Sequence, residues 1–254
     1  MKKHYFLLPL LCLFVIASNA QDSPTVKHKW NFVAEPYLMF PNMNGTIGLG
    51  TLPDAPLDLN PGDILNHLQM GAMVYLEAHN DKWAVSSDFL YMKLGQDVTP
   101  NKIINKGDVT MKETVWEATG MYRVIPWLEV GAGLRLYSIN TVLNLNYKTG
   151  LVFDTARTES LTKTWVDPIV ITRITAPFKG KCLLQLRADI GGFGIGSKFA
   201  WQIQVDAGYK FSKLFQATVG YRYIDVDYES GSGSDRFLYN IATFGPTIRF
   251  AFNF

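Results

Sequence analysis

The side chains best suited to chemistry are few and widely separated in this sequence. Beyond residue 20, histidine occurs only at His28, His67 and His79, and Cys182 is the only cysteine. No two of these residues have the spacing that metal ligands take on one helix or strand. The sequence therefore predicts no metal site and no cofactor.

A glycine-rich run from Gly191 to Gly196 has the composition of a phosphate-binding loop. Such a loop needs a following helix whose N-terminal amides face the phosphate. Here the residues from Phe199 onward alternate in the manner of a strand, so we expect the glycines to shape a tight loop instead.

Three acidic residues, Asp225, Asp227 and Glu229, share one face of another alternating segment. Their carboxylates are suitable donors for divalent cations that bridge lipopolysaccharide. A solvated acidic rim explains the same pattern more simply.

The composition limits the class of protein. The 254 residues include 24 Lys and Arg against 22 Asp and Glu, and charged residues make up 18%, below the roughly 25% of an ordinary soluble domain. Hydrophobic residues at 48% exclude a disordered chain. The near-zero charge balance leaves no electrostatic footprint for nucleic acid.

The N-terminus predicts export. A basic start, Met1-Lys2-Lys3, precedes an apolar stretch from Tyr5 to Ala17 and the small-residue ending Ser18-Asn19-Ala20. This is the pattern of a signal peptide over residues 1–20, cleaved to leave a domain over 21–254. An uncleaved anchor is the alternative, but the stretch is short for a span of about 20 residues. No later apolar run is long enough for a membrane helix, so a membrane protein would have to be a closed barrel.

Strict alternation supports the barrel. From Phe199 to Phe211 every second residue is apolar or aromatic, and the same period-two pattern recurs at 128–136, 184–190 and 215–223. A soluble β-sandwich also alternates, but its strands average about five or six residues. Segments of ten or more residues are long enough to cross a membrane at a tilt.

The connections alternate as well, with tight turns after the second, fourth, sixth and eighth strands and longer loops elsewhere. This is typical of an all-β, transmembrane, antiparallel up-and-down barrel of about ten strands, with eight or twelve possible. The uncertain segments are Gly45–Asn60 and Leu143–Leu161, which could extend above the bilayer or form part of the wall. The expected strands lie near 30–40, 69–79, 83–96, 110–124, 128–142, 164–176, 182–192, 199–211, 215–228 and 237–254.

The C-terminus is the most specific single feature. Ile248, Phe250, Phe252 and Phe254 alternate with polar or small residues, and the chain stops on phenylalanine. This ending resembles the terminal-strand signature by which the assembly machinery recognises outer-membrane barrels. We expect Phe250, Phe252 and Phe254 to act as the assembly signal.

Several phrases resemble a largely uncharacterised family of Gram-negative outer-membrane β-barrel proteins. They are Trp165-Val166-Asp167-Pro168, the run from Asp189 to Ser197, the run from Gly220 to Tyr228, and Gly245-Pro246; Asp63-Ile64-Leu65 and Trp83 to Tyr91 fit the N-terminal half. The resemblance covers nearly the whole mature chain. It implies the fold and the outer-membrane location, but no catalytic residues.

The polar face of each strand defines a predicted lumen. The first five strands contribute mainly acids and the later strands mainly arginines, with Asp167, Asp189 and Asp206 as exceptions. A closed, salt-bridged core and a narrow charged channel both account for this arrangement. The predicted lumen-lining residues are Glu35, Glu77, Asp88, Glu117, Glu129, Arg135, Arg173, Arg187, Arg222 and Arg249.

Aromatic residues at the strand ends predict two interfacial belts. The periplasmic belt would contain Trp30, Trp83, Trp127, Phe178, Phe211 and Phe254, and the outer belt Trp165, Phe199, Tyr228 and Phe237.

The predicted function is that of an outer-membrane barrel, either a structural envelope component or a narrow porin-like channel. Its expected partners are outer-membrane lipid and lipopolysaccharide, together with the barrel-assembly machinery and periplasmic chaperones. The alternative is an outer-membrane protease or lipid-modifying enzyme with an active site at the rim. Only His67 lies on the outer side, in a segment that predicts a short helix with Asn60 as cap, Pro61 in the first turn and an apolar side of Ile64, Leu65 and Leu68. We expect no enzymatic activity.

Overall fold

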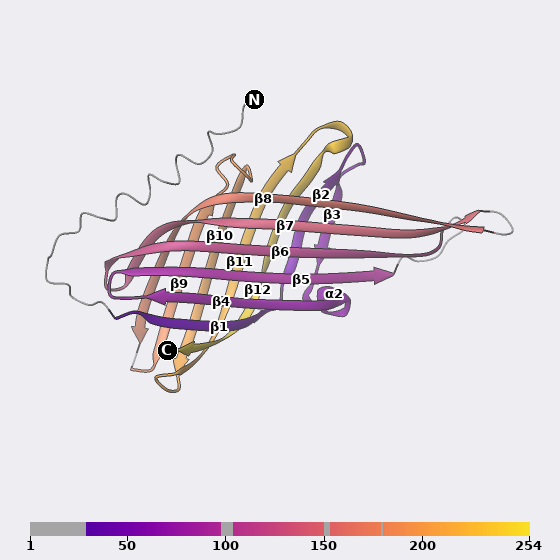
Figure 1. Ribbon diagram of the computed structural model, residues 1–254. Helices are drawn as coiled ribbons and strands as arrows, with labels where there is room; N and C mark the ends of the chain where they lie inside the picture. Colours follow the sequence, from indigo (N-terminus) through magenta and orange to yellow (C-terminus); the bar gives the residue numbers. More distant parts are fainter. Residues whose placement is uncertain (1–28, 98–103, 150–152, 179) are drawn as a thin grey trace, which may run out of the picture.

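The computed structural model describes residues 29–97, 104–149, 153–178 and 180–254, and the predicted signal peptide lies outside them. Antiparallel strands dominate this part of the chain (Figure 1). In chain order the elements are β1 (Asn31–Met39), β2 (Asn42–Leu49), β3 (Ala55–Leu59), α2 (Pro61–His67), β4 (Leu68–His79), β5 (Trp83–Asp97), β6 (Ile104–Ile125), β7 (Leu128–Thr149), β8 (Phe153–Phe178), β9 (Cys182–Gly191), β10 (Phe199–Lys210), β11 (Phe215–Ser230) and β12 (Phe237–Asn253), with a 3-10 turn at Gly233–Asp235 before β12.

The sheet closes on itself to form a barrel with ten wall positions, as predicted. Strand β12 pairs with β11 on one side and with both β1 and β2 on the other. The final closing bonds join Phe32 to Phe254, whose backbone nitrogens each donate to the other's carbonyl at 3.1 and 2.8 Å.

Two of the ten positions in the barrel wall are each occupied by more than one element. In the first, β1 and β2 pair one after the other with β12. They are separated by Phe40 and Pro41, where Phe40 N donates to Pro246 O. Gly245 permits this contact, because a Cβ there would lie 2.1 Å from the Phe40 carbonyl oxygen. The second position, where the chain runs back toward the periplasmic end, consists of β3, α2 and β4. In it β3 pairs with β2, and β4 pairs with β1 and β5.

Strands β6, β7 and β8 are longer than the sequence predicted and project well beyond the rest of the wall (Figure 1). On β6 the outward-facing residues are apolar up to Trp116 and then become Thr114, Lys112 and Thr110. The extension therefore rises above the bilayer, and residues 143–149 and 153–161 belong to it. Residues Gly45–Asn60 form the smaller β2–β3 hairpin and the residue that caps α2.

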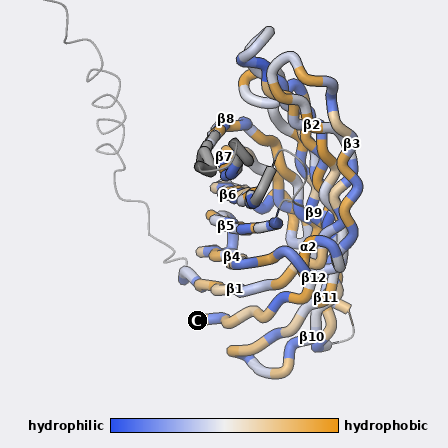
Figure 2. Tube along the Cα trace, turned by 90° about the vertical axis from the view of Figure 1, so that its right-hand side faces the viewer, coloured by the Kyte–Doolittle hydropathy of each residue, from blue (hydrophilic) through white to orange (hydrophobic). Residues whose placement is uncertain are grey.

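Hydrophobic and hydrophilic residues alternate along the strands (Figure 2), and the exposed side chains of the wall are mainly the apolar ones. On β10, Phe199, Val205 and Tyr209 are exposed, while Gln202 and Gln204 point inward and are buried. Within the described part of the chain, no helix has the length and apolar character needed to cross a membrane.

The periplasmic aromatic belt is present, and the predicted outer belt is largely wrong. All six periplasmic members are exposed, and Phe199 is exposed at the outer side. Trp165, Tyr228 and Phe237 are instead buried inside the barrel, with 5%, 8% and 4% of their surfaces exposed. Trp165 has the same parity as the inward Asp167, so its ring points into the lumen. Trp116 and Tyr221 take the exposed positions on the outer side.

We predict that loss of the terminal residue impairs assembly beyond its local contacts. Removing Phe254 deletes one pair of closing hydrogen bonds, whereas Phe254→Ala keeps the backbone and removes only the ring. Both variants should lower the amount of heat-modifiable barrel in membrane fractions far more than loss of one side chain's burial, about 1.5–3 kcal/mol, would suggest. Phe211→Ala, which removes another exposed periplasmic ring, is the matched control. Equal membrane levels for Phe254→Ala and the control would contradict the assembly-signal role.

Candidate functional site: the charged interior

The ten predicted lumen residues all lie on the inner face of the barrel. Nine are buried, and Glu35 is partly buried. The acids come from β1, β4, β5, β6 and β7, and the arginines from β7, β8, β9, β11 and β12. Because strands follow one another around the wall, acids and arginines face each other across the interior.

The central cluster is built around Arg135, whose side chain has no exposed surface. Its guanidinium donates to Glu117 Oε2 from Nε at 2.9 Å and from Nη2 at 2.6 Å, and to Asp189 Oδ1 at 2.8 Å. Arg187 binds the other oxygen of Glu117, and Gln202 Nε2 donates to Asp189 Oδ2 at 3.0 Å. Both carboxylates are thus fully used inside the barrel.

A second cluster lies closer to the periplasmic end. Arg173 on β8 binds Glu77 on β4, across the lumen, and Arg173 Nε donates to Glu129 Oε2 at 2.5 Å. Tyr75 accepts a further bond from Arg173 at 3.1 Å, and Arg123 at the rim binds Glu129 at 2.7 Å. This cluster ties four wall strands together, namely β4, β6, β7 and β8.

A third cluster centres on Arg222. Arg222 Nη1 lies 3.1 Å from Asp88 Oδ2 and also donates to the Tyr37 hydroxyl at 3.1 Å. Arg222 Nε donates to Gln202 Oε1 at 2.9 Å, which links this cluster to the central one. Tyr37 in turn donates to Asp88 Oδ1 at 2.8 Å.

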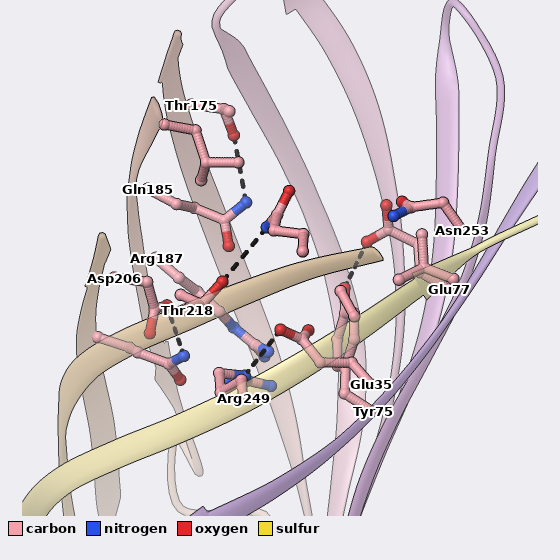
Figure 3. A pocket seen from close by; sticks show the side chains of 15 residues that line it. Glu35, Tyr75, Glu77, Thr175, Gln185, Arg187, Asp206, Thr218, Arg249 and Asn253 are labelled. Carbon is pink, nitrogen blue, oxygen red and sulfur yellow. Dashed lines mark hydrogen bonds and ion pairs between the residues drawn. The ribbon is translucent and has the colours of Figure 1, made fainter. Parts of the chain in front are cut away.

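Below these clusters, a small cavity of about 160 Å³ opens toward the periplasmic end (Figure 3). Arg249 and Glu35 lie across from each other there, 3.4 Å apart. Asp206 accepts a hydrogen bond from Gln204 at 2.7 Å and lies on the same cavity wall. The cavity is therefore polar and of a size for a few water molecules.

Above the ion pairs, aromatic rings fill the outer half of the lumen. Trp165 stacks between Tyr137 and Tyr228, with ring centroids 5.0 and 3.9 Å away, and Tyr239 lies at 5.9 Å. The Tyr239 hydroxyl donates to the buried Glu113 at 3.2 Å. This aromatic layer and the ion-pair clusters both lie in the interior of the barrel.

The glycine-rich run forms a loop, as expected, and it is anchored to the wall. Ser197 donates from its backbone nitrogen and its hydroxyl to the two oxygens of Asp167, at 2.6 and 2.7 Å. Trp165 Nε1 donates to the Ser197 hydroxyl at 3.0 Å. Gly192 and Gly194 have φ values of 83° and 76°, a region that favours glycine.

At the outer rim, Glu229 is engaged in ion pairs. Lys198 Nζ lies 2.6 Å from one Glu229 oxygen and Arg236 Nε 2.8 Å from the other, while Arg236 also binds Asp54 at 2.6 Å. Hydrogen bonds from Lys198 and Arg236 lower the pKa of Glu229, and the bond from Arg236 lowers the pKa of Asp54. These pairs fasten the β2–β3 hairpin to the β11–β12 loop.

The predicted helix at residues 60–67 forms as α2, with Asn60 as its cap and Pro61 in its first turn. Only Ile64 of the predicted apolar side is buried, and Leu65 and Leu68 are exposed, because the helix inserts one edge into the interior core. His67 Nδ1 lies 2.6 Å from the Asp63 carbonyl oxygen. No cluster of three potential metal-ligating His, Cys, Asp or Glu residues occurs among the residues that the structure describes.

Comparison with known proteins supports the fold. No family model and no curated protein matches the sequence. Among solved structures, the outer membrane protease OmpT from Escherichia coli matches with a TM-score of 0.54 and 8% identity, over 92% of this chain and 99% of that one. Ail from Yersinia pestis matches with a TM-score of 0.38 and 10% identity, over 89% and 98% of the two chains. A FadL homologue from Pseudomonas aeruginosa matches with a TM-score of 0.35 and 7% identity, over 90% of each.

The closed wall, its apolar outer band and the likeness to a solved outer-membrane barrel agree. The chain has the fold of an outer-membrane β-barrel. Its described interior holds three ion-pair clusters, and Gln202 joins the clusters of Arg135 and Arg222.

Part of the barrel's interior was not predicted from the sequence. Tyr37, Tyr75 and Gln202 bond to the charged groups, and Glu113 is buried beside Tyr239. The alternation along each strand could have identified them, because each lies an even number of residues from an inward-facing charged residue on the same strand and so shares its face.

We predict that Arg222→Ala destabilises the barrel by leaving Asp88 with a single hydroxyl partner. Breaking a buried ion pair by removing one member costs about 3–5 kcal/mol. The temperature at which the folded form is lost in unboiled electrophoresis should fall clearly. The double change Arg222→Met with Asp88→Asn should recover much of the loss, because no unpaired charge remains.

Arg236→Ala removes two solvent-accessible ion pairs at the rim, with Asp54 and Glu229, and serves as the control, since such pairs contribute little. An Arg222→Ala barrel as heat-resistant as this control would show that the Arg222–Asp88 pair does not support the fold.

Proposed function

We propose that this protein is a structural component of the outer membrane whose lumen is closed, rather than a diffusion channel. The observation that carries the proposal is the fully buried Arg135 bound to Glu117 and Asp189 from neighbouring and more distant strands. The side chains bound to it directly or through Gln202 are buried as well, with Glu117, Gln202 and Arg222 at most 2% exposed, which supports a lumen without a water-filled path at that level.

The energetics favour the closed state. Opening a path would separate several buried pairs, each costing about 3–5 kcal/mol once one partner is left without the other. Three such losses amount to roughly 10 kcal/mol, and each 1.4 kcal/mol lowers a population about tenfold. An open state would therefore be far too rare for steady conduction.

We infer that membrane lipid, lipopolysaccharide and the assembly machinery all contact the outer surface of the barrel. The exposed apolar band and the periplasmic aromatic belt provide the contact with lipid. The outward-facing Phe250, Phe252 and Phe254 provide the motif for the assembly machinery and its periplasmic chaperones. The outer rim, with Lys198 and Arg236, faces the lipopolysaccharide headgroups.

We further infer that the protein is not an enzyme. OmpT is a protease, but the likeness to it concerns the fold alone. His67, the histidine on the outer side, contacts the backbone of its own helix rather than a carboxylate or hydroxyl side chain. A general base requires a partner within hydrogen-bond reach.

This non-catalytic proposal predicts that His67→Ala leaves any peptidase or lipid deacylase signal of the purified barrel unchanged. These activities are measured as turnover of a peptide mixture and of labelled lipopolysaccharide. His79→Ala, at the periplasmic turn, is the control variant. Activity that disappears only in His67→Ala would replace the structural proposal with a rim enzyme.

The closed lumen predicts no steady conductance in planar bilayers. The protein should insert, as shown by heat-modifiable migration after recovery, yet give no stepwise current in molar salt. Arg222→Ala should still fail to conduct steadily, because Arg135 and Arg173 remain in place. Regular current steps in the wild type, with a shift toward cations in Arg222→Ala, would instead establish the narrow channel.

A further inference from the structure

The outer end of the barrel divides into two extensions that enclose a cavity. One consists of the outer parts of β6, β7 and β8, and the other of the β2–β3 hairpin with the β11–β12 loop. β8 pairs with β9 only from Ile169 onward, and β3 pairs with β2 alone among the described strands. The extensions are thus not joined by a ladder at either seam, and the cavity between them has a volume of about 840 Å³.

This cavity lies outside the bilayer. Outward of Trp116, the exterior of the β6–β8 extension is polar, and its side chains bond to one another, as in the Asn140–Thr162 pair at 2.8 Å. Val109, which lines the cavity, lies seven residues further along β6 than Trp116. At about 3.3 Å per residue, the cavity extends from roughly 10 Å beyond Trp116 at Lys163, which pairs with Ile139, to roughly 20 Å beyond it at Val109.

The cavity lining is largely apolar although it faces the outside. Val109, Leu143 and Leu161 contribute from the longer extension, and Leu49 and Leu52 from the hairpin. Leu49 and Leu52 remain 40% and 67% exposed. Large apolar side chains gathered in an open hollow are characteristic of a ligand-binding site, and the volume lies within the usual range of about 300–1,000 Å³.

One cation in this cavity has no carboxylate partner among the described residues. Lys163 is partly buried on the inner face of β8, and its Nζ lies 5.9 Å from the centre of the Phe237 ring. The other cation, Arg236, is already paired with Asp54 and Glu229. Asp235 lines the rim and is exposed to solvent.

We propose that this cavity binds a single-chain anionic amphiphile, such as a medium- or long-chain carboxylate, from outside the membrane. The anionic group would pair with Lys163 above the aromatic layer, and the hydrocarbon chain would pack against Leu143, Leu161 and Leu52. A neutral chain would gain only the apolar contact, so Lys163 provides the selectivity. This role goes beyond the structural one and is compatible with a closed lumen, because the cavity lies outward of the aromatic layer, with Lys163 two residues beyond Trp165 on β8.

The test uses photolabelling of the full mature barrel in a neutral amphipathic polymer at pH 8. The probe is decanoate carrying a diazirine near its chain end, and the labelled peptides are identified by mass spectrometry. We expect labelling in residues 49–52, 141–143 and 160–163. Free decanoate should protect these residues at a concentration at least about tenfold lower than the concentration of decanol that gives the same protection. Labelling of the lipid-facing surface, which should not distinguish the two competitors, is the internal reference.

Two variants separate the charge from the apolar lining. Lys163→Gln should abolish the preference for decanoate over decanol while leaving heat-modifiability intact, and Lys213→Gln in a periplasmic turn should keep it. Leu143→Asp should remove labelling of the cavity by both ligands. Equal protection by decanoate and decanol in the wild type, or labelling confined to the lipid-facing surface, would overturn the proposal.

Discussion

The need to fill a closed barrel with side chains that satisfy one another's charge governs this structure. Arg135 shows the constraint most clearly, because its guanidinium is fully buried and its charge is compensated by ion pairs with Glu117 and Asp189. A slip of one residue in any of their strands would turn that side chain toward lipid and leave its partners unpaired. The ion pairs therefore specify strand register as well as occupying the lumen, and the apolar exterior follows from the same alternation.

Carboxylates outnumber guanidinium groups in the described interior, and neutral donors make up the difference. Tyr37 donates to Asp88, Gln202 to Asp189, and Ser197 to Asp167. A buried carboxylate accepts several hydrogen bonds, so tyrosine and glutamine supplement arginine at Asp88 and Asp189, and serine binds Asp167. The phrases that carry the family resemblance contain Asp167, Asp189 and Arg222, which explains those phrases by barrel filling and loop anchoring rather than by catalysis.

Much of this arrangement could be predicted from the sequence because strand parity is local. Period-two alternation was enough to identify the inward charges, the tight turns and the ten wall positions. The outer belt was wrong because it relied on position along the strand: Trp165 shares parity with Asp167, and Tyr228 shares parity with Arg222, so both rings point inward. The break at Phe40–Pro41 and the pairing of Arg173 with Glu77, 96 residues away, depend on how distant strands meet across the barrel, and no local pattern encodes that.

The inner and outer halves of the barrel interior are filled by different kinds of contact. Near the membrane core, charges pair with charges, and every added contact makes opening the lumen more costly. Further out, the wall is no longer closed, so the aromatic rings of Tyr137, Trp165 and Tyr228 cover the ion pairs from above and exclude water from them. In the proposed closed barrel this layer separates the ion pairs from the apolar hollow above it, so the hollow can stay open without weakening the pairs below. A barrel with a closed lumen is thus compatible with a ligand-sized cavity on its outer side.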